Sequence, residues 1–224
     1  MLTGLTSLLY GLISLIGVVA GITVHEFSHA LSADILGDPT PRYNGRLTLN
    51  PLAHLDPLGG MMILMSSLSG FGFGWGKPVP VNPVNLRFGP RVGMALTAFA
   101  GPFSNLVLAT LAVAPIRIAH TLRVSLPYML SLILTIIATV NVSLALFNLL
   151  PFAPLDGFSV LRGVFSLIRT DWAYRIGSFL DRVEPYGPII LLLLFATGWI
   201  LPFSLIGVLL KPLITLLMRA ILGL

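Results

Sequence analysis

The chain has 224 residues, of which 56% are hydrophobic and only 9% are charged. A soluble domain carries about 25% charged residues, so the composition excludes an ordinary soluble protein and indicates one embedded in a membrane. The absence of cysteine excludes disulfide bonds, thiolate metal ligands and a cysteine nucleophile. The net charge of +5 comes from basic residues scattered near segment ends, which reports membrane topology rather than nucleic-acid binding.

Six hydrophobic segments follow one another, and several reach the length of about 20 residues that a bilayer demands. We expect an all-α polytopic membrane protein, one domain over residues 1–224, whose spanning helices are residues 5–36, 92–116, 127–150, 186–200 and 203–222. The sixth segment, residues 58–75, is broken by glycines. Residues 77–83 alternate proline with valine and predict a small β element. Residues 158–185 predict an amphipathic connector at the membrane surface.

His25 and His29 lie four residues apart in the first hydrophobic segment, in the sequence His25-Glu26-Phe27-Ser28-His29. On a helix this spacing puts both imidazoles on one face, where they can take two corners of a tetrahedral zinc site. Zinc would lower the pKa of a water to about 7, and Glu26 could accept its proton as it attacks a carbonyl. Each ionisable group within a bilayer costs roughly 2.5–3.5 kcal/mol, which favours a metal site over an accidental polar patch.

Three residues compete to be the third metal ligand: His54, Asp56 and Asp156. His54 and Asp56 belong to a proline-bounded loop, where polar residues are ordinary. Asp156 lies between Pro154 and Gly157 at the end of a spanning segment, although an Asp-Gly pair is also a common turn. Two arguments from membrane topology favour Asp156.

The first argument is that both ligand-bearing segments must end on the same membrane face. This requires residues 58–75 to dip into the membrane and return as a re-entrant segment, which irregular backbone buried in protein permits. A re-entrant segment places ten basic residues on one face: Arg42, Arg46, Lys77, Arg87, Arg91, Arg162, Arg169, Arg175, Arg182 and Arg219.

The second argument is the resulting charge bias. Only Arg117 and Arg123 then lie on the other face, whereas a crossing segment would give eight basic residues against four. The positive-inside rule prefers the first arrangement. We therefore expect the site to lie toward the cytoplasmic side, with the N-terminus outside and the C-terminus inside.

Three separated motifs resemble the site-2 protease family of intramembrane zinc metalloproteases, peptidase family M50. They are His25-Glu-Phe-Ser-His29, Gly101-Pro-Phe-Ser-Asn105 and Asn148-Leu-Leu-Pro-Phe-Ala-Pro-Leu-Asp-Gly157, in the family's order. The stretches Asn50-Pro-Leu-Ala-His54-Leu-Asp-Pro57 and Phe73-Gly-Trp-Gly-Lys-Pro-Val-Pro-Val-Asn82 look like its compact prokaryotic branch. Residues 20–160 carry the resemblance, and we expect no PDZ or CBS domain in the chain.

The resemblance implies cleavage of transmembrane protein substrates within the bilayer of a prokaryotic cell membrane. His25, His29 and Asp156 would bind one Zn²⁺ per chain, and Glu26 would be the catalytic base. Asn105 and Asn148 would bind the substrate backbone or the tetrahedral intermediate, although either amide could equally stabilise helix packing. His54 could orient the site or bind substrate, or be an ordinary loop histidine. Ala153 stands where relatives often have proline.

We expect the substrate to unwind and add as a strand to residues 77–82, and the helices within 186–222 to form a lateral gate. The rival functions are ion transport through the histidine pair and a catalytically silent binding role. Transport would need further ionisable groups within the spanning segments, and a silent relative commonly lacks the glutamate. The sequence predicts the lipid bilayer as surroundings and no nucleic-acid partner, and no feature of it indicates an oligomeric state.

Overall fold

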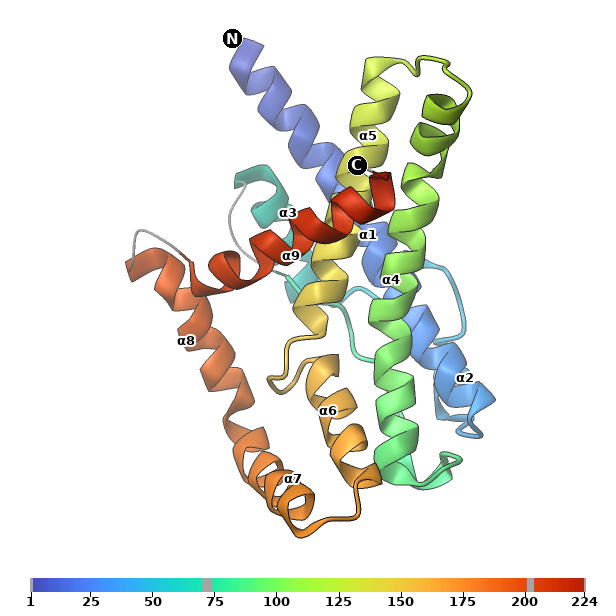
Figure 1. The fold of residues 1–224 in the computed structure, drawn as a ribbon, viewed down its shortest axis with the longest axis vertical. Coiled ribbons are helices and arrows are strands. Elements are labelled where there is room, and N and C mark those ends of the chain that lie inside the picture. The colour runs from blue at the N-terminus through green and yellow to red at the C-terminus, as the bar shows by residue number, and fades with distance from the viewer. Residues whose placement is uncertain (1, 70–73, 201–203, 224) are drawn as a thin grey trace.

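The computed structural model describes residues 2–69, 74–200 and 204–223, and these residues are almost entirely helical (Figure 1). In chain order the elements are α1 (Leu2–Ile35), α2 (Thr40–Tyr43), η1 (Pro51–Ala53), α3 (Pro57–Ser69), η2 (Pro83–Asn85), α4 (Pro90–Thr121), α5 (Tyr128–Asn148), α6 (Asp156–Leu167), α7 (Asp171–Val183), η3 (Glu184–Tyr186), α8 (Gly187–Ile200) and α9 (Leu205–Leu222).

The helices α1, α4 and α5 pack against one another and form the centre of the bundle. Small residues line the contact between α4 and α5, where Ala109 and Val113 meet Ala138 and Val142, and Met218 of α9 closes the cluster. Small side chains let helix backbones approach closely, which is how membrane helices gain packing energy where lipid is as apolar as the protein. This close packing fixes the relative positions of the three helices that carry most of the site.

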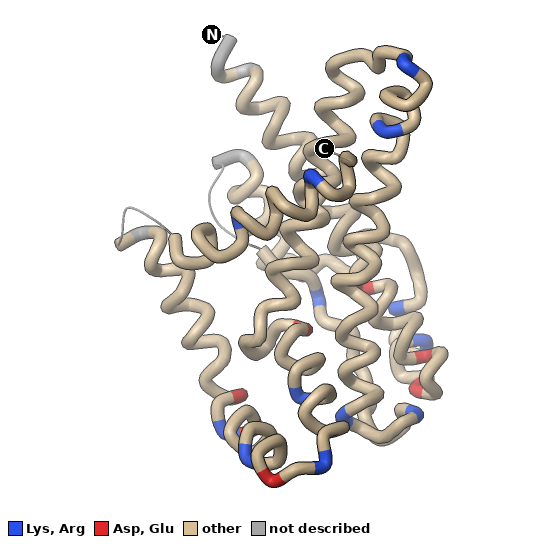
Figure 2. Tube along the Cα trace, viewed as in Figure 1, with Lys and Arg blue, Asp and Glu red and all other residues tan. Residues whose placement is uncertain are grey.

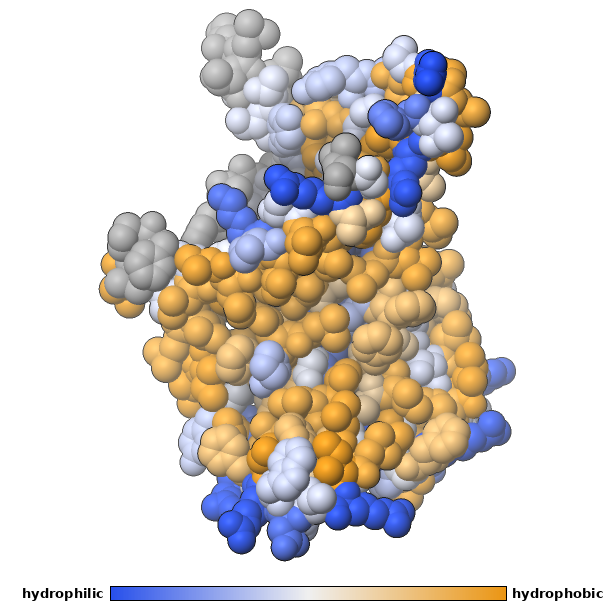
Figure 3. Space-filling view, in the orientation of Figure 1, coloured by the Kyte–Doolittle hydropathy of each residue, from blue (hydrophilic) through white to orange (hydrophobic). Residues whose placement is uncertain are grey.

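Among the residues that the structure describes, four helices are long and apolar enough to cross a membrane: residues 6–35 of α1, and α4, α5 and α9. On the face shown in Figure 3, a broad apolar band crosses the middle of the molecule, and hydrophilic residues gather at the upper and lower ends of the molecule. The prediction of an all-α polytopic membrane protein is therefore confirmed. The fifth expected spanning helix, residues 186–200, is not confirmed. Helix α8 has 14 residues and is therefore about 21 Å long, shorter than the hydrocarbon core of a bilayer, which is about 30 Å thick.

The segment expected to be re-entrant leaves and rejoins the bundle at one place. Leu55 and Gly76 form an antiparallel bridge, and the N–H of Lys77 donates to the carbonyl of His54 at 2.7 Å. Between them α3 has 13 residues, about 20 Å, too short to cross a bilayer. The ends of this segment therefore lie on the same side of the bundle.

The expected β element is not confirmed in the part of the chain that the structure describes, where that single bridge is the only pairing. Residues 77–82 are extended but have no neighbouring strand. Pro78 and Pro80 have no N–H to donate, and the N–H of Asn82 donates instead to a carboxylate oxygen of Asp38 at 2.7 Å. The missing proline N–H groups and this side-chain contact therefore explain why residues 77–82 form no strand-to-strand hydrogen bonds.

Residues 158–185, expected as an amphipathic connector at the membrane surface, differ in part from that expectation. They form two helices, and α6 packs along α4, where Gly163 lies directly against Ala95. Only α7 lies across the lower end of the molecule in Figure 1. The Asp-Gly pair at residues 156–157 therefore begins a helix that runs from within the bundle to its lower end (Figure 1).

The expectation that the C-terminus lies on the same side as the larger basic group is wrong. The guanidinium of Arg117, at the end of α4, donates to the carbonyl of Ile221 at 3.3 Å, so α9 ends beside α4. Both termini lie at the upper end of the molecule in Figure 1. The cause is that α8 already rises from the lower end, so that α9 finishes at the upper end. Arg219 thus joins the smaller basic group, but the charges still gather at the lower end (Figure 2).

Candidate metal centre

Helix α1 presents both imidazoles to the first residue of α6. Nε2 of His25 lies 3.0 Å from Oδ2 of Asp156, and Nε2 of His29 lies 3.3 Å from Oδ1 of the same carboxylate. The two Nε2 atoms are 3.0 Å apart. The structure thus brings together the three residues predicted to bind metal, although 127 positions separate His29 from Asp156 in the sequence.

The other ring nitrogen of each histidine, Nδ1, donates a hydrogen bond to an acceptor on α4. Nδ1 of His25 donates to the amide oxygen of Asn105 at 2.7 Å, and Nδ1 of His29 donates to the backbone carbonyl of Thr97 at 2.7 Å. A proton on each Nδ1 leaves the lone pair of each Nε2 pointing at Asp156. This is how proteins orient histidines that bind metal.

The three residues fit a divalent cation. Two imidazole lone pairs and a carboxylate converge with ligand atoms within 4.8 Å of one another, and Oδ2 of Asp156 is a buried oxygen with no hydrogen-bond donor. Three acceptors this close need positive charge among them, and two imidazoles with one carboxylate are a donor set for zinc.

Glu26 lines a cavity that is also lined by His25, His29 and Asp156. The cavity has a volume of about 670 Å³ and is lined mainly by apolar side chains of α1, α4, α5, α8 and residues 74–81. A β-carbon on Gly76 would lie 3.2 Å from Oε1 of Glu26, so the extended segment passes directly over this carboxylate. Glu26 makes no ion pair with His25, His29 or Asp156 and is free to act on a reactant in the cavity.

Asn105 lies beside the metal centre, but its amide is fully engaged within the protein. Its oxygen accepts from His25, and its nitrogen donates to the carbonyl of Gly21 at 3.0 Å and to Oδ1 of Asn141 at 2.9 Å. The side chain is fully buried. Because no N–H of this amide remains for a substrate, the geometry supports a role in orienting His25 rather than substrate binding.

The other candidates from sequence occupy different places. Asn148 lines the cavity, and its amide nitrogen donates to the carbonyl of Leu144 at 2.9 Å. His54 is fully buried outside the lining of that cavity, with Nε2 bound to the carbonyl of Thr48 at 2.7 Å. Asp56 accepts the N–H of Gly59 at 2.8 Å and caps α3, so it is not a metal ligand.

Sequence reasoning missed two contributions to the site. The carbonyl of Thr97 holds His29, and a backbone atom leaves no signal in the residue type. Asn141 was not among the residues proposed for the site, although a buried amide in a membrane helix is itself a signal of function.

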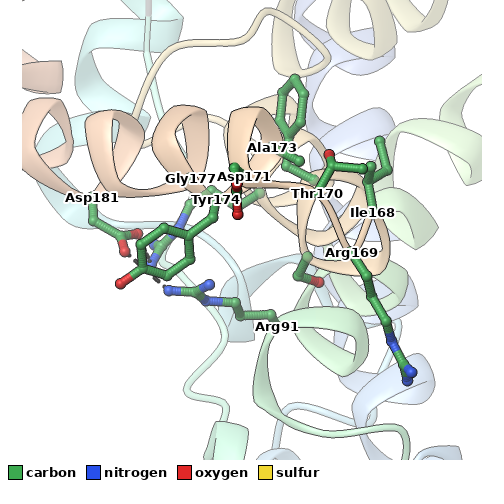
Figure 4. Close-up of a pocket in the computed structure, with 12 residues that line it drawn as sticks. Arg91, Ile168, Arg169, Thr170, Asp171, Ala173, Tyr174, Gly177 and Asp181 are labelled. Atoms are coloured by element: carbon green, nitrogen blue, oxygen red, sulfur yellow. Dashed lines mark hydrogen bonds and ion pairs between the residues drawn. The ribbon is translucent and has the colours of Figure 1, made fainter.

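A second cavity, of about 380 Å³, lies between α4, α6 and α7 (Figure 4). Three of its charged groups are paired: Arg91 and Arg162 both contact the carboxylate of Asp181, at 3.0 and 2.7 Å. No residue of the metal centre lines it. These ion pairs hold α7 against α4 and α6.

The fold and the site together define a polytopic membrane protein with a His-His-Asp metal centre and a neighbouring glutamate. Comparisons with known proteins agree. A sequence model of peptidase family M50 matches residues 113–180. The Bacillus subtilis protein named "Putative zinc metalloprotease YwhC" is 36% identical over 186 residues, which cover 81% of this chain and 79% of that protein.

Mycobacterial proteins named "Putative zinc metalloprotease Rip2" are also similar. The one from Mycolicibacterium smegmatis is 30% identical over 151 residues, covering 65% of this chain and 54% of that protein. The one from Mycobacterium tuberculosis is 30% identical over 147 residues. No solved structure matches the chain significantly. The chain belongs to peptidase family M50, the site-2 protease family of zinc metalloproteases.

Proposed function

We propose that this protein is an intramembrane metalloprotease that hydrolyses peptide bonds of transmembrane segments, with one zinc ion per chain. The observation that carries the proposal is the convergence of His25, His29 and Asp156 inside a helix bundle of membrane-spanning length. His25 lies ten residues before the end of α1, about 15 Å along the helix. This is about half the thickness of a hydrocarbon core of about 30 Å, so the site would lie deep in the membrane.

Each residue of the site would have a distinct part in hydrolysis. His25, His29 and Asp156 would hold zinc, which when bound polarises a carbonyl and supplies a nucleophile at neutral pH. Glu26 would accept a proton from the attacking water and pass it to the leaving amine. The apolar wall of the cavity would exclude bulk water, so that charges in the site act in surroundings of low dielectric constant.

The substrate would lie along the extended segment that crosses the cavity. Val79 and Val81 line the cavity, so the segment presents backbone to a substrate that has unwound from its helix. Val79→Asp should reduce cleavage and leave zinc content unchanged, because it alters this wall but no ligand. Unchanged cleavage would exclude strand addition here.

Helix α8 is placed to act as the lateral gate. It lines the cavity with Leu191, Leu192 and Phe195, and the ring of Phe195 lies 5.7 Å from that of Phe147 on α5. At its base Gly187 packs against Ala153 so closely that a side chain could not fit. A helix anchored at one end and held by an aromatic pair higher up could swing to admit a substrate from the lipid.

The membrane orientation follows from the charges. The lower end of the molecule carries most of the basic residues, and the positive-inside rule would place it in the cytoplasm of a prokaryotic cell. The metal centre would then open toward the cytoplasmic half of the membrane, with the start of α1 outside. Residues 58–75 would have both ends toward the cytoplasmic side, because Leu55 and Gly76 pair with each other.

The proposed function is tested by reconstituting the protein in liposomes with a fluorescent transmembrane substrate. We expect products cut within the apolar segment, located by mass spectrometry, and loss of cleavage with a zinc chelator that added zinc restores. Cleavage confined to a soluble loop would contradict an intramembrane site. Cleavage that persists without zinc would contradict a metalloprotease.

A further inference from the structure

A line of four hydrogen-bonding groups crosses the bundle from α5 to the metal centre. The amide nitrogen of Asn141 donates to the carbonyl of Ile137 at 2.9 Å, and its oxygen accepts from Asn105 at 2.9 Å. The oxygen of Asn105 then accepts from Nδ1 of His25 at 2.7 Å. The line therefore begins at a backbone carbonyl of α5 and ends at a ring whose other nitrogen faces Asp156.

The backbone fixes the direction of every bond in this line. The carbonyls of Ile137 and Gly21 can only accept, so the nitrogens of Asn141 and Asn105 must face them. If the amide of Asn105 were turned over, its oxygen would oppose two other oxygens. Its nitrogen would then face Nδ1 of His25 and drive the proton to Nε2, where it would block metal binding. The orientation of Asn105 is therefore a condition for the site.

The surroundings leave these amides no alternative partner. Asn105 and Asn141 are fully buried. A β-carbon on Gly21 would lie 2.8 Å from Oδ1 of Asn141 and 2.7 Å from Leu144, so the helices close over the amides. Burying an amide without its hydrogen-bond partners is unfavourable, so each bond in the line depends on the next.

We propose that Asn141 is a positioning residue that sets the tautomer of His25 through Asn105, and thereby the zinc affinity. This inference rests on the proposed function because it assumes that zinc binds at His25. It assigns a task to a residue outside the three motifs. It also explains why α5 carries a buried amide whose own contacts include no metal ligand.

Three variants on α5 test the inference. Asn141→Leu keeps the volume and removes both the donor and the acceptor. Asn141→Asp should keep the native zinc affinity. A carboxyl group buried there with no cation beside it is neutral, so it can donate to the carbonyl of Ile137 and accept from Asn105. Ser143→Ala is the matched control, since that hydroxyl only donates to the carbonyl of Thr139 on its own helix.

Zinc affinity is measured in detergent by competition with a chelator, together with thermal unfolding. Loss of an outer partner of a metal ligand typically costs 10–100-fold in affinity, so we expect Asn141→Leu to bind zinc about tenfold more weakly. Asn141→Asp and Ser143→Ala should stay close to the native affinity. In zinc-loaded chain labelled with ¹⁵N-histidine, the Nδ1 proton signal of His25 should change in Asn141→Leu alone.

Equal zinc affinity in Asn141→Leu and Ser143→Ala would overturn the inference. An Asn141→Asp variant that loses as much affinity as Asn141→Leu would also overturn it, since this would indicate a packing role. If the native chain bound no zinc, the proposed function would fail together with the inference. Native binding with equal affinities in all variants would remove the inference alone.

Discussion

A β-carbon on Gly101 would lie 2.5 Å from Nε2 of His29, a separation that real side chains essentially never show. It would also lie 2.7 Å from Cε1 of His25, so α4 passes directly beside both imidazoles. Asn105 lies one turn further along the same helix and holds His25 from its other edge. Within the Gly101-Pro-Phe-Ser-Asn105 element, Gly101 thus leaves room for both imidazole rings, and Asn105 orients the ring of His25.

Gly101→Ala should weaken zinc binding, because at least one imidazole must move to make room for the methyl group. We expect the dissociation constant for zinc to rise about tenfold or more, the scale at which a disturbed metal ligand is felt. Gly177→Ala is the control, since a β-carbon there meets nothing within 4 Å. Native zinc affinity in Gly101→Ala would contradict the packing described here.

Arg46 holds the extended segment beside the cavity. It is buried, and its guanidinium donates to the carbonyls of Ala53, Lys77 and Pro78 at 2.6, 3.1 and 3.3 Å. Arg46→Lys keeps the charge but loses the planar fork that reaches all three. We expect cleavage to fall about tenfold or more, since small displacements of a substrate site are costly. Zinc content should be unchanged.

The matched control for this substitution is Arg42→Lys. Arg42 makes an exposed bidentate pair with Asp34, so this change should alter neither cleavage nor zinc content. If Arg46→Lys cleaved as fast as Arg42→Lys, the extended segment would not position the substrate.

Asp38 gives the fold a pH dependence. It is fully buried, and burial opposes its charge, but hydrogen bonds from Thr40, Asn85 and Asn82 prevail and lower its pKa below the ordinary value. Because folding lowers this pKa, the stabilisation is complete above the ordinary value of about 3.9 and is lost as the pH falls through the folded value.

Thermal unfolding in detergent tests this dependence. Asp38→Asn cannot titrate, so it should be less stable than the native chain near neutral pH and lose less stability on acidification to about pH 3. The gap between the two unfolding temperatures should therefore narrow as the pH falls. Parallel curves would show that Asp38 does not contribute.

The extent of prediction from sequence differed between elements. The metal ligands could be predicted because His25 and His29 share a helix face and Asp156 follows a spanning segment. The return of residues 58–75 was predicted from the need to bring those ligands together, and the bridge between Leu55 and Gly76 agrees. Both predictions combined a local sequence pattern with the requirement that the metal ligands, which are far apart in the sequence, meet on one side of the membrane.

Other features depend on packing that no local pattern contains. The C-terminal end of α9 was assigned to the wrong side because residues 186–200 were assumed to cross completely, whereas α8 is short. Asn105 and Asn141 are ordinary amides in the sequence. Only the approach of α1, α4 and α5 turns them into a directed line ending at His25.

The contact between Phe147 and Phe195 should control access to the cavity. An aromatic pair contributes about 0.5–1.5 kcal/mol, so Phe195→Ala should let α8 move away from α5 more often. We expect cleavage of a transmembrane substrate to become several-fold faster, up to about tenfold. Leu193→Ala is the control, because Leu193 is an exposed residue of the same helix. Slower or unchanged cleavage in Phe195→Ala would argue against α8 as the gate.

The most direct test of the account pairs zinc content with cleavage of a transmembrane substrate, for the native chain and for Glu26→Gln. Glu26 lines the cavity but makes no ion pair with the proposed ligands, so its replacement should leave zinc binding intact and remove the base. The account predicts about one zinc per chain in both proteins and cleavage only in the native one. Zinc in both with equal cleavage, or with none in either, would contradict it.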